Sequence, residues 1–262
     1  MNNSSEHKAE PIKQKMQRGE TVFSMTVRLI RTVEIAGLAR AAGYDSIYMD
    51  LEHSALSLET VSQISIASLA TGIAPFVRVP TLDPALISRA LDAGATGVIV
   101  PDVRSADEAR AIVRAAKSHP LGERSLLGAV PQLDYRALPM ADAAAELNAL
   151  ISVVVMIESQ AGLAAVDEIA AVPGVDILLV GANDISFEHG VAGQYDHDVV
   201  HQAYLRTFDA CTRHGKILGV GGLASRPDLI RKYIDLGGRY VSLAGDLPLL
   251  LSAAKQKRSE FA

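Results

Sequence analysis

The sequence predicts an α/β fold, a single (β/α)8 TIM barrel, from a repeated pattern of helix end, glycine and short apolar run. Four stretches share it: "ARAAGYDSIYMD", "ALDAGATGVIVPD", "AAVPGVDILLVGAND" and "YIDLGGRYVSLAGD". Glycine just past a helix is the expected left-handed cap, and a continuous Val/Ile/Leu run is typical of a strand buried on both faces. No composition break divides the 262 residues, and no dinucleotide fingerprint follows the first strand. A closed barrel of about 250 residues therefore fits better than a doubly wound sheet.

The pattern predicts eight strands and eight helices in alternation. The strands are expected near 22–25, 47–50, 75–79, 97–101, 153–157, 177–181, 217–220 and 240–243. The helices are expected at 32–42, 57–70, 84–93, 105–117, 162–171, 199–214, 226–236 and 246–257.

Three segments stand outside this regular alternation. Residues 1–16 read as a polar tail or short helix outside the core, which leaves 17–262 for the barrel domain. The stretch 119–140 is too long for an ordinary connection, and its polar residues are expected in solvent, with one or two at the pocket rim. The last helix, "DLPLLLSAAKQK", has more leucine than the outer face of one barrel needs, so we expect it to pack on a neighbouring subunit.

Composition excludes several classes of partner. A formal charge of -5 and a pI near 5.8 disfavour nucleic acid and anionic membranes as partners. No apolar run approaches the roughly 20 residues that span a bilayer, and the N-terminal stretch does not resemble a secretory signal, so a cytoplasmic location is expected. The single cysteine, Cys211, excludes an internal disulfide framework and a thiolate metal cluster.

Ionisable side chains gather where the predicted strands end, the face on which barrels of this type carry their chemistry. They are Asp50, Glu52 and His53 after the second strand, Arg78 in the third, and Asp102, Glu158 and Asp184 after the next three. Five of them have a structural alternative: a helix cap for Asp102 or Asp184, an ion pair for Arg78 with Glu158, a loop position for His53. Five such groups on one face nevertheless indicate a ligand site, because charge inside a barrel mouth is costly unless it is paired.

The residue types at these positions favour metal-assisted chemistry on a 2-oxo acid. Glu158 and Asp184 offer hard oxygen ligands, which suit Mg²⁺ or Mn²⁺, with Co²⁺ as a further option. Arg78 offers a planar fork for a carboxylate. His53, held by Asp50, is the expected proton carrier, because histidine changes protonation near neutral pH. A Schiff-base mechanism would need a lysine in the pocket, and none is predicted there.

In sequence order, "AGYDSIYMDLEH", "VRVP", "LDAGATGVIVPDV", "MIES", "VDILLVGANDIS" and "GKILGVGG" resemble the HpcH/HpaI aldolases, metal-dependent class II pyruvate aldolases of the phosphoenolpyruvate/pyruvate barrel superfamily. The resemblance runs from about residue 18 to 255. It implies an aldehyde-lyase that reversibly cleaves a 4-hydroxy-2-oxo acid to pyruvate, or a related 2-oxo acid, and an aldehyde. It also implies a homohexamer built as a trimer of dimers.

The resemblance assigns roles residue by residue. Asp50 and His53 match the base, Arg78 matches the oxo-acid-binding arginine, and Glu158 and Asp184 match the metal ligands. The substrate is expected to contact Arg78 and the segment that precedes the metal aspartate, which is Gly181, Ala182 and Asn183.

The sequence departs from the family pattern at three places, and alternatives follow. Many members have Gln where this chain has Met156, Gly-Pro before the metal aspartate where it has Gly181, Ala182 and Asn183, and a Trp in the first strand that is absent here. These departures concern the choice of substrate. One alternative is a lyase of the citramalyl or malyl type that acts on CoA thioesters, and another is a barrel that binds an oxo acid without catalysis. The stretch "GVGGLASRPD" fits either a phosphate-binding turn or a turn that lets backbone approach the substrate.

Overall fold

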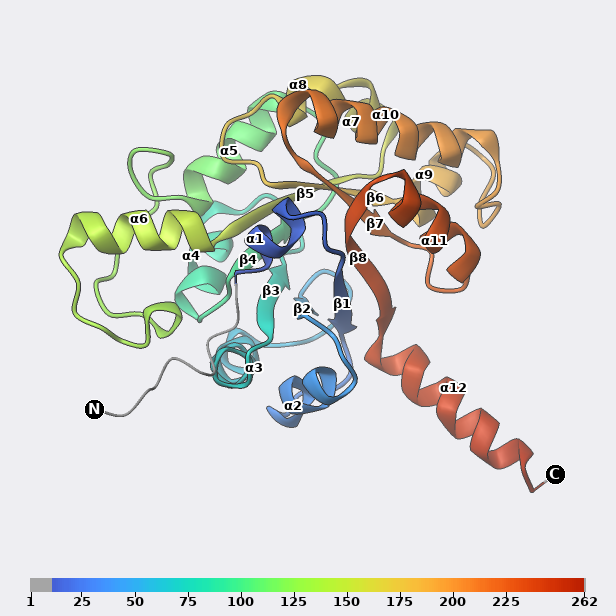
Figure 1. Ribbon diagram of the computed structural model, residues 1–262, viewed down its shortest axis with the longest axis horizontal. Helices are drawn as coiled ribbons and strands as arrows, with labels where there is room; N and C mark the ends of the chain where they lie inside the picture. Colours follow the sequence, from blue (N-terminus) through green and yellow to red (C-terminus); the bar gives the residue numbers. More distant parts are fainter. Residues whose placement is uncertain (1–10, 262) are drawn as a thin grey trace.

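The computed structural model describes residues 11–261, and the strands in this range form a closed parallel barrel in chain order, as predicted (Figure 1). The strands are β1 (Val22–Val27), β2 (Ser46–Asp50), β3 (Ala74–Arg78), β4 (Gly97–Val100), β5 (Ser152–Ile157), β6 (Ile177–Gly181), β7 (Ile217–Gly221) and β8 (Gly238–Gly245). The four glycines before β2, β4, β6 and β8 all have positive φ, which confirms the cap pattern.

Helices surround the barrel and return the chain to its N-terminal end. They are α1 (Ile12–Gln17), α2 (Glu34–Ala41), α3 (Leu58–Thr71), α4 (Pro84–Asp92), α5 (Ala106–Ala116), α6 (Met140–Leu150), α7 (Gln160–Ala164), α8 (Val166–Ala170), α9 (Ala182–Glu188), α10 (Asp198–His214), α11 (Pro227–Leu236) and α12 (Asp246–Ser259). The helix predicted at 162–171 is divided into α7 and α8, and α1, α6 and α9 have no counterpart among the eight predicted helices.

Local sequence sets where several helices begin. The Ser57 hydroxyl accepts a hydrogen bond from the Thr60 amide at 3.1 Å, and Ser105 does the same for Glu108 at 3.2 Å. Asp83 accepts from two amides of the first turn of α4, which has proline at its first position. Each bond satisfies an amide that has no partner inside its own helix.

The barrel interior is apolar and is closed at its N-terminal end by α1. Ile12 and Met16 are buried there against a cluster that includes Phe76 and Tyr240, whose rings stack with centroids 5.6 Å apart. The expectation that the chain up to residue 16 lies outside the core is therefore wrong for these positions. Ile12 and Met16 lie four residues apart in α1, so they share one face of the helix, and that face is buried. The rest of that predicted tail, residues 1–10, lies outside the described residues.

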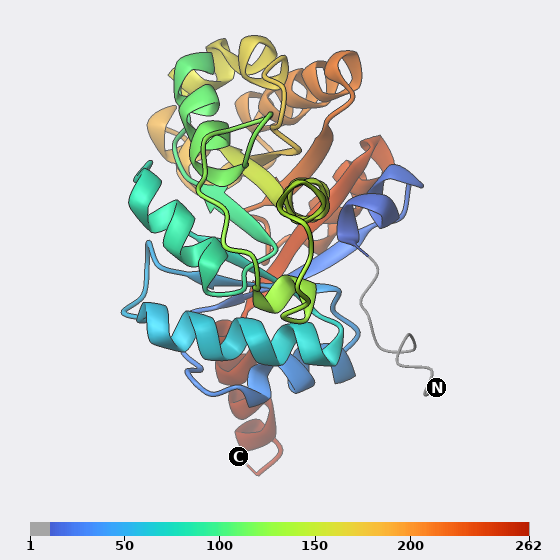
Figure 2. The ribbon, with the colours of Figure 1, turned by 90° about the vertical axis from the view of Figure 1, so that its left-hand side faces the viewer.

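The long stretch between α5 and β5 packs at the N-terminal end, away from the strand ends that carry the ionisable groups. A 3-10 helix, η1 (Pro131–Leu133), packs with α6 and α3, on the side that Figure 2 faces. Gln132 and Arg124 are buried rather than solvated, and Gln132 donates to the carbonyls of Leu91 and Ala95. The prediction that this stretch reaches the pocket rim is wrong.

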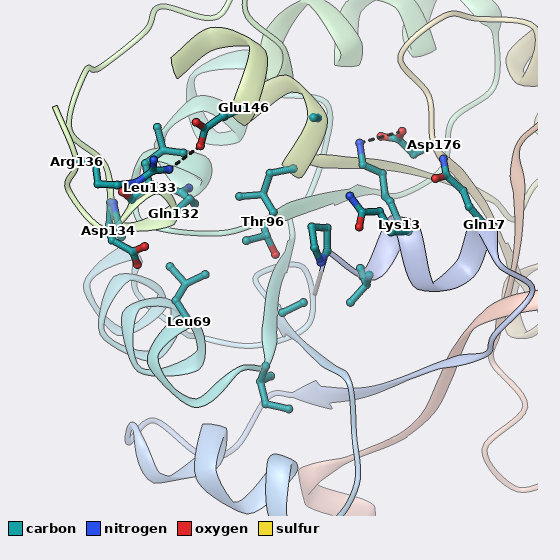
Figure 3. Close-up of a pocket in the computed structure, with 18 residues that line it drawn as sticks. Lys13, Gln17, Leu69, Thr96, Gln132, Leu133, Asp134, Arg136, Glu146 and Asp176 are labelled. Carbon is teal, nitrogen blue, oxygen red and sulfur yellow. Dashed lines mark hydrogen bonds and ion pairs between the residues drawn. The ribbon is translucent and has the colours of Figure 1, made fainter. Parts of the chain in front are cut away.

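A cavity of about 690 Å³ lies at this N-terminal end, between α1, α3, η1 and α6 (Figure 3). Four of its charged lining residues form two pairs: Lys13 Nζ lies 3.4 Å from Asp176 Oδ1, and Arg136 Nη2 lies 2.6 Å from Glu146 Oε2. Pairs of this kind stabilise the ends of the elements that they join and leave no unneutralised charge for a reaction.

The last helix, α12, projects away from the barrel (Figure 1). Its first residue, Asp246, is buried, whereas the side chains of Leu247, Leu249, Leu250 and Leu251 are between 40% and 58% exposed. No helix in residues 11–261 is both long and apolar enough to cross a membrane.

Candidate active site

A second cavity, of about 490 Å³, opens at the C-terminal end of the barrel. Residues from the ends of β1, β2, β3, β5, β6, β7 and β8 line it, together with the first turn of α12. The predicted site residues His53, Arg78, Gly181, Asn183 and Asp184 are all part of this lining. The topology therefore brings side chains from distant parts of the sequence into one pocket, as the strand-end pattern predicted.

Asp50 is the buried anchor of the site, with no solvent exposure. Arg78 binds it in a bidentate manner, with Nε donating to Oδ1 at 2.9 Å and Nη2 donating to Oδ2 at 2.7 Å. Arg28 Nε adds a third contact to Oδ2 at 2.5 Å. Burial alone would raise the pKa of Asp50. The hydrogen bonds and positive charges of the two arginines outweigh this effect and lower the pKa to about 2. Asp50 is thus an ionised structural acid at neutral pH.

The loop after β2 is fixed by the same carboxylate. The backbone amides of Glu52 and His53 donate to Asp50 Oδ1 at 3.1 and 3.2 Å. The predicted contact of the His53 ring with Asp50 does not occur among the described residues. Instead, His53 Nε2 lies 3.6 Å from Glu52 Oε2, because the arginines and backbone amides already occupy the Asp50 oxygens.

Arg78 lines the pocket and pairs with Glu52. Arg78 is 6% exposed, and its Nη1 lies 2.9 Å from Glu52 Oε2 and 3.9 Å from the Met156 sulfur. Hydrogen bonds and charge from Asp50 raise the pKa of Arg78 against the effect of burial. Burial raises the pKa of Glu52, with Asp50 and Asp184 adding to the effect. The predicted ion pair of Arg78 with Glu158 is replaced by pairs with Asp50 and Glu52.

Glu158 follows β5 and is 8% exposed. Its Oε1 accepts from the Asp102 amide at 2.7 Å, whereas its Oε2 accepts no hydrogen bond from the described residues. Burial, with the negative charges of Asp184 and Glu52, raises the pKa of Glu158 to about 7. A buried carboxylate beside two others is a site that a cation would stabilise.

Asp102 serves this site through its backbone and not through its carboxylate. Its φ of 50° lies in the left-handed region that aspartate tolerates better than most residues, and its amide points at Glu158. The Asp102 side chain instead turns outward to Arg104, with Nη2 to Oδ2 at 2.7 Å. The carboxylate predicted for the site at this strand end therefore lies outside it.

The segment after β6 completes the pocket opposite Arg28. Asp184 is exposed in the first turn of α9, and Asn183 Oδ1 accepts from the Tyr195 hydroxyl at 2.6 Å. Gly181 is required here, because a Cβ would lie 2.5 Å from Glu158 Oε2. Ala182 is buried beneath the segment. At Gly222, a Cβ would lie 2.9 Å from the Asn183 amide nitrogen, so glycine lets the turn after β7 pack against the Asn183 backbone.

Glu158 and Asp184 fit a divalent cation through the chemistry of their oxygens. Glu158 Oε2 is free of hydrogen bonds from the described residues, and the missing Cβ of Gly181 keeps its surroundings open. Within residues 11–261 no three His, Cys, Asp or Glu side chains form a ready ligand group. Two carboxylates with the remaining positions left to water and substrate match Mg²⁺ or Mn²⁺ better than Zn²⁺.

The sequence pattern missed Arg28, which directly follows β1 and lines the cavity. A basic residue at the C-terminal end of a strand was the available signal, but the strand was predicted at 22–25, whereas β1 runs to Val27 and so ends directly before Arg28. No lysine of residues 11–261 lines this cavity, in agreement with the prediction against a Schiff-base site.

Comparison with known proteins agrees with this architecture. Residues 31–253 match the family model described as HpcH/HpaI aldolase/citrate lyase. The chain is 38% identical over 245 residues to the 4-hydroxy-4-methyl-2-oxoglutarate aldolase of Hapsidospora irregularis, with 92% of this chain and 91% of that protein covered. It is 34% identical over 256 residues to the hydroxypyruvate/pyruvate aldolase of Paraburkholderia phytofirmans, covering 95% and 96%.

Among solved structures, the HpcH/HpaI aldolase from Desulfitobacterium hafniense superposes with a TM-score of 0.90 at 29% identity. The match covers 95% of this chain and 96% of that one. The likeness therefore extends over the barrel and beyond the strand-end residues.

Proposed function

The chain belongs to the HpcH/HpaI aldolase/citrate lyase family, and we propose that this aldolase reversibly cleaves a 4-hydroxy-2-oxo acid to pyruvate, or a related 2-oxo acid, and an aldehyde. The observation that carries the proposal is the buried Glu158, on which the charges of Asp184 and Glu52 act, directly behind Gly181 in the wall of the cavity that Arg78, His53 and Asp184 line. Carboxylates, a guanidinium and an imidazole facing one pocket can bind an oxo acid and move a proton.

We propose that Glu158 and Asp184 hold the divalent cation on which aldolases of this family depend, either Mg²⁺ or Mn²⁺. When bound, the cation supplies the Lewis acidity that makes a 2-oxo acid able to form its enolate. Arg78 Nη1, the one guanidinium nitrogen outside the fork to Asp50, faces the pocket and would bind the oxo acid. Gly181 and the backbone of Ala182 and Asn183 would line the part of the pocket that binds the oxo acid.

Cleavage breaks the bond between C3 and C4 of the substrate. The C4 hydroxyl gives its proton to a base, the electron pair of the broken bond passes to the enolate of pyruvate, and a proton then returns to C3. His53 is the proton carrier in this proposal, since its side chain is 58% exposed at the cavity and adjoins Glu52. Asp50, with its pKa of about 2, stays ionised and positions Arg78 and the loop.

A homohexamer, arranged as a trimer of dimers, is the assembly that we propose. The exposed leucines of α12 support it, because an apolar surface on a projecting helix is stabilised when a neighbour covers it. A monomer mass by light scattering at micromolar concentration would contradict this part of the proposal.

The activity is tested by incubating the protein with pyruvate and a panel of aldehydes, with Mg²⁺ or Mn²⁺ and with a chelator. We expect aldol formation that the chelator abolishes. Turnover of a CoA thioester without any turnover of hydroxy-oxo acids would favour the thioester lyase. Metal and pyruvate binding without turnover of any panel member would favour a non-catalytic barrel.

A further inference from the structure

The floor of the C-terminal cavity, defined here by five lining residues beneath the strand ends, is polar on one side and apolar on the other. Hydroxyl side chains reach the polar side from three neighbouring strands: Thr26 from β1, Tyr48 from β2 and Ser242 from β8. Met156 from β5 and Leu179 from β6 line the apolar side. The proposed reaction uses groups nearer to the mouth and gives these hydroxyls no role.

Tyr48 places a phenol hydroxyl in this floor. It lies two residues before Asp50 on β2, so its side chain points into the barrel as that of Asp50 does, one layer deeper. Tyr48 is 7% exposed and belongs to the apolar cluster of the barrel interior. A phenol hydroxyl in such surroundings usually has a hydrogen-bond partner.

The proton of the Tyr48 hydroxyl has no acceptor within residues 11–261. The Tyr48 oxygen accepts a long hydrogen bond from Ser242 Oγ at 3.5 Å, which leaves the tyrosine proton unused. Tyr240, also buried in the barrel interior, differs: its hydroxyl donates to Ser24 Oγ at 3.1 Å, and it does not line the cavity. A buried donor that lines a cavity and has no acceptor of its own is most simply explained by an acceptor on the ligand.

Arg78 brings the oxo acid to the same deep part of the cavity. Its guanidinium carbon lies 6.0 Å from the centre of the Tyr48 ring, and its Nη1 lies 3.9 Å from the Met156 sulfur. Nε and Nη2 donate to Asp50, so Nη1, which also lies 2.9 Å from Glu52 Oε2, is the nitrogen that remains for the substrate. One nitrogen cannot satisfy all the oxygens of a 2-oxo acid, and the Met156 thioether has no proton to donate. A second donor at the floor is therefore needed.

Building on the proposed aldolase function, we infer that the Tyr48 hydroxyl donates a hydrogen bond to an oxygen of the 2-oxo acid that Arg78 binds. Tyr48 is then a further catalytic residue, which contacts the substrate from the floor, whereas His53 acts from the mouth, where its side chain is 58% exposed. A donor fixed in a buried site stabilises negative charge that develops on the ligand, so the bond supports the enolate as well as the bound acid. Tyr48 neither gains nor loses a proton in this account.

Pyruvate binding to the Mn²⁺-loaded protein, measured by calorimetry, tests the inference. Tyr48→Phe keeps the ring and removes only the hydroxyl, so pyruvate should bind at least about 10-fold more weakly than to the parent, the loss expected for a hydrogen bond to a charged group. The Mn²⁺ affinity of Tyr48→Phe should match that of the parent, because Tyr48 is not one of the proposed metal ligands. Tyr240→Phe is the matched control: it removes a buried hydroxyl that does not line the cavity, and it should bind pyruvate as the parent does.

Parental pyruvate affinity in Tyr48→Phe overturns the inference and leaves the aldolase function intact. A joint loss of Mn²⁺ and pyruvate affinity overturns it as well, because Tyr48 would then only support the site as a whole. If the parent itself binds no pyruvate in the presence of Mn²⁺, the inference and the proposed function both fall. Should Tyr48→Phe be unfolded by circular dichroism, Tyr48→Leu, which also lacks the hydroxyl, takes its place with the same two expected results.

Discussion

The two ends of the barrel both bury charge, but they do so in different ways. At the N-terminal end, the ammonium of Lys117 is 1% exposed, and burial lowers its pKa to about 8. It nevertheless donates to the carbonyls of Asn148 and Ile151 and lies 3.6 Å from Asp176. At the C-terminal end, Glu158 has one oxygen without a hydrogen bond from the described residues and two carboxylates for neighbours. A shifted pKa indicates function only where the group also faces a ligand.

The larger of these two cavities is not the one whose residues suggest a reaction. The N-terminal cavity is the larger, about 690 Å³ against about 490 Å³, but its charged residues pair with each other (Figure 3). The smaller cavity is lined by Asp184, whose charge acts on the buried Glu158. In barrels the C-terminal end carries the reaction and the N-terminal end carries stability, and variants at matched positions can test that division.

The largest expected effect comes from the proposed metal ligands. Glu158→Gln or Asp184→Asn should reduce metal-dependent turnover by at least about 10³-fold, because the Lewis acid is lost. Both variants should also lose Mn²⁺ binding in calorimetry. Asp176→Asn is the matched control at the other end and should bind Mn²⁺ as the parent does. Retention of parental Mn²⁺ affinity in either ligand variant would refute the assignment.

The next effect concerns the proton carrier. His53→Ala should lower kcat by about 10²–10⁴-fold, the usual loss when a general base is removed. His214→Ala, which removes the histidine paired with Asp167 at the last turn of α10, should leave kcat unchanged. Glu52→Gln should cost less than His53→Ala, because Glu52 adjoins the ring and pairs with Arg78 but does not carry the proton in this proposal. Parental turnover in His53→Ala would place the base elsewhere.

The pH dependence of stability provides a third test. Without metal, the pKa of Glu158 is raised from 4.5 to about 7, so between these values the folded state holds a proton that the unfolded chain has released. The free energy of unfolding should therefore fall as pH rises through this window, by on the order of 3 kcal/mol. Urea titrations of metal-free protein should show this slope, and Glu158→Gln should lack it. An identical slope in both proteins would assign the effect to another group.

The smallest expected effect lies at the N-terminal end. Lys117→Met leaves the Asn148 carbonyl without its donor, which should lower the free energy of unfolding by about 1–3 kcal/mol. The kcat/KM should stay within about twofold of the parent value. A tenfold fall in kcat/KM, in protein that is folded by circular dichroism, would mean that this end takes part in the reaction.

The sequence predicted the barrel well because its strands are buried on both faces and its helices end in glycine caps. It also placed Arg78, His53, Gly181, Asn183 and Asp184 at one pocket, since parallel strands bring their ends together. Three features could not be predicted in this way. The pairing of His53 with Glu52 depends on how the Asp50 oxygens are shared, Asp102 acts through its amide, and Arg28 is fixed by Asp246, 218 residues away. All three depend on contacts between residues far apart in the chain, which no local pattern records.

The central claim is that the C-terminal end of the barrel enolises a 2-oxo acid with metal assistance. Proton exchange of the pyruvate methyl group in deuterated buffer, followed by NMR, measures this step without an aldehyde partner. We predict exchange with Mg²⁺ or Mn²⁺, none above background with a chelator or in Glu158→Gln, and the parental rate in Lys117→Met. Exchange at the parental rate in chelator-treated protein or in Glu158→Gln would contradict the claim.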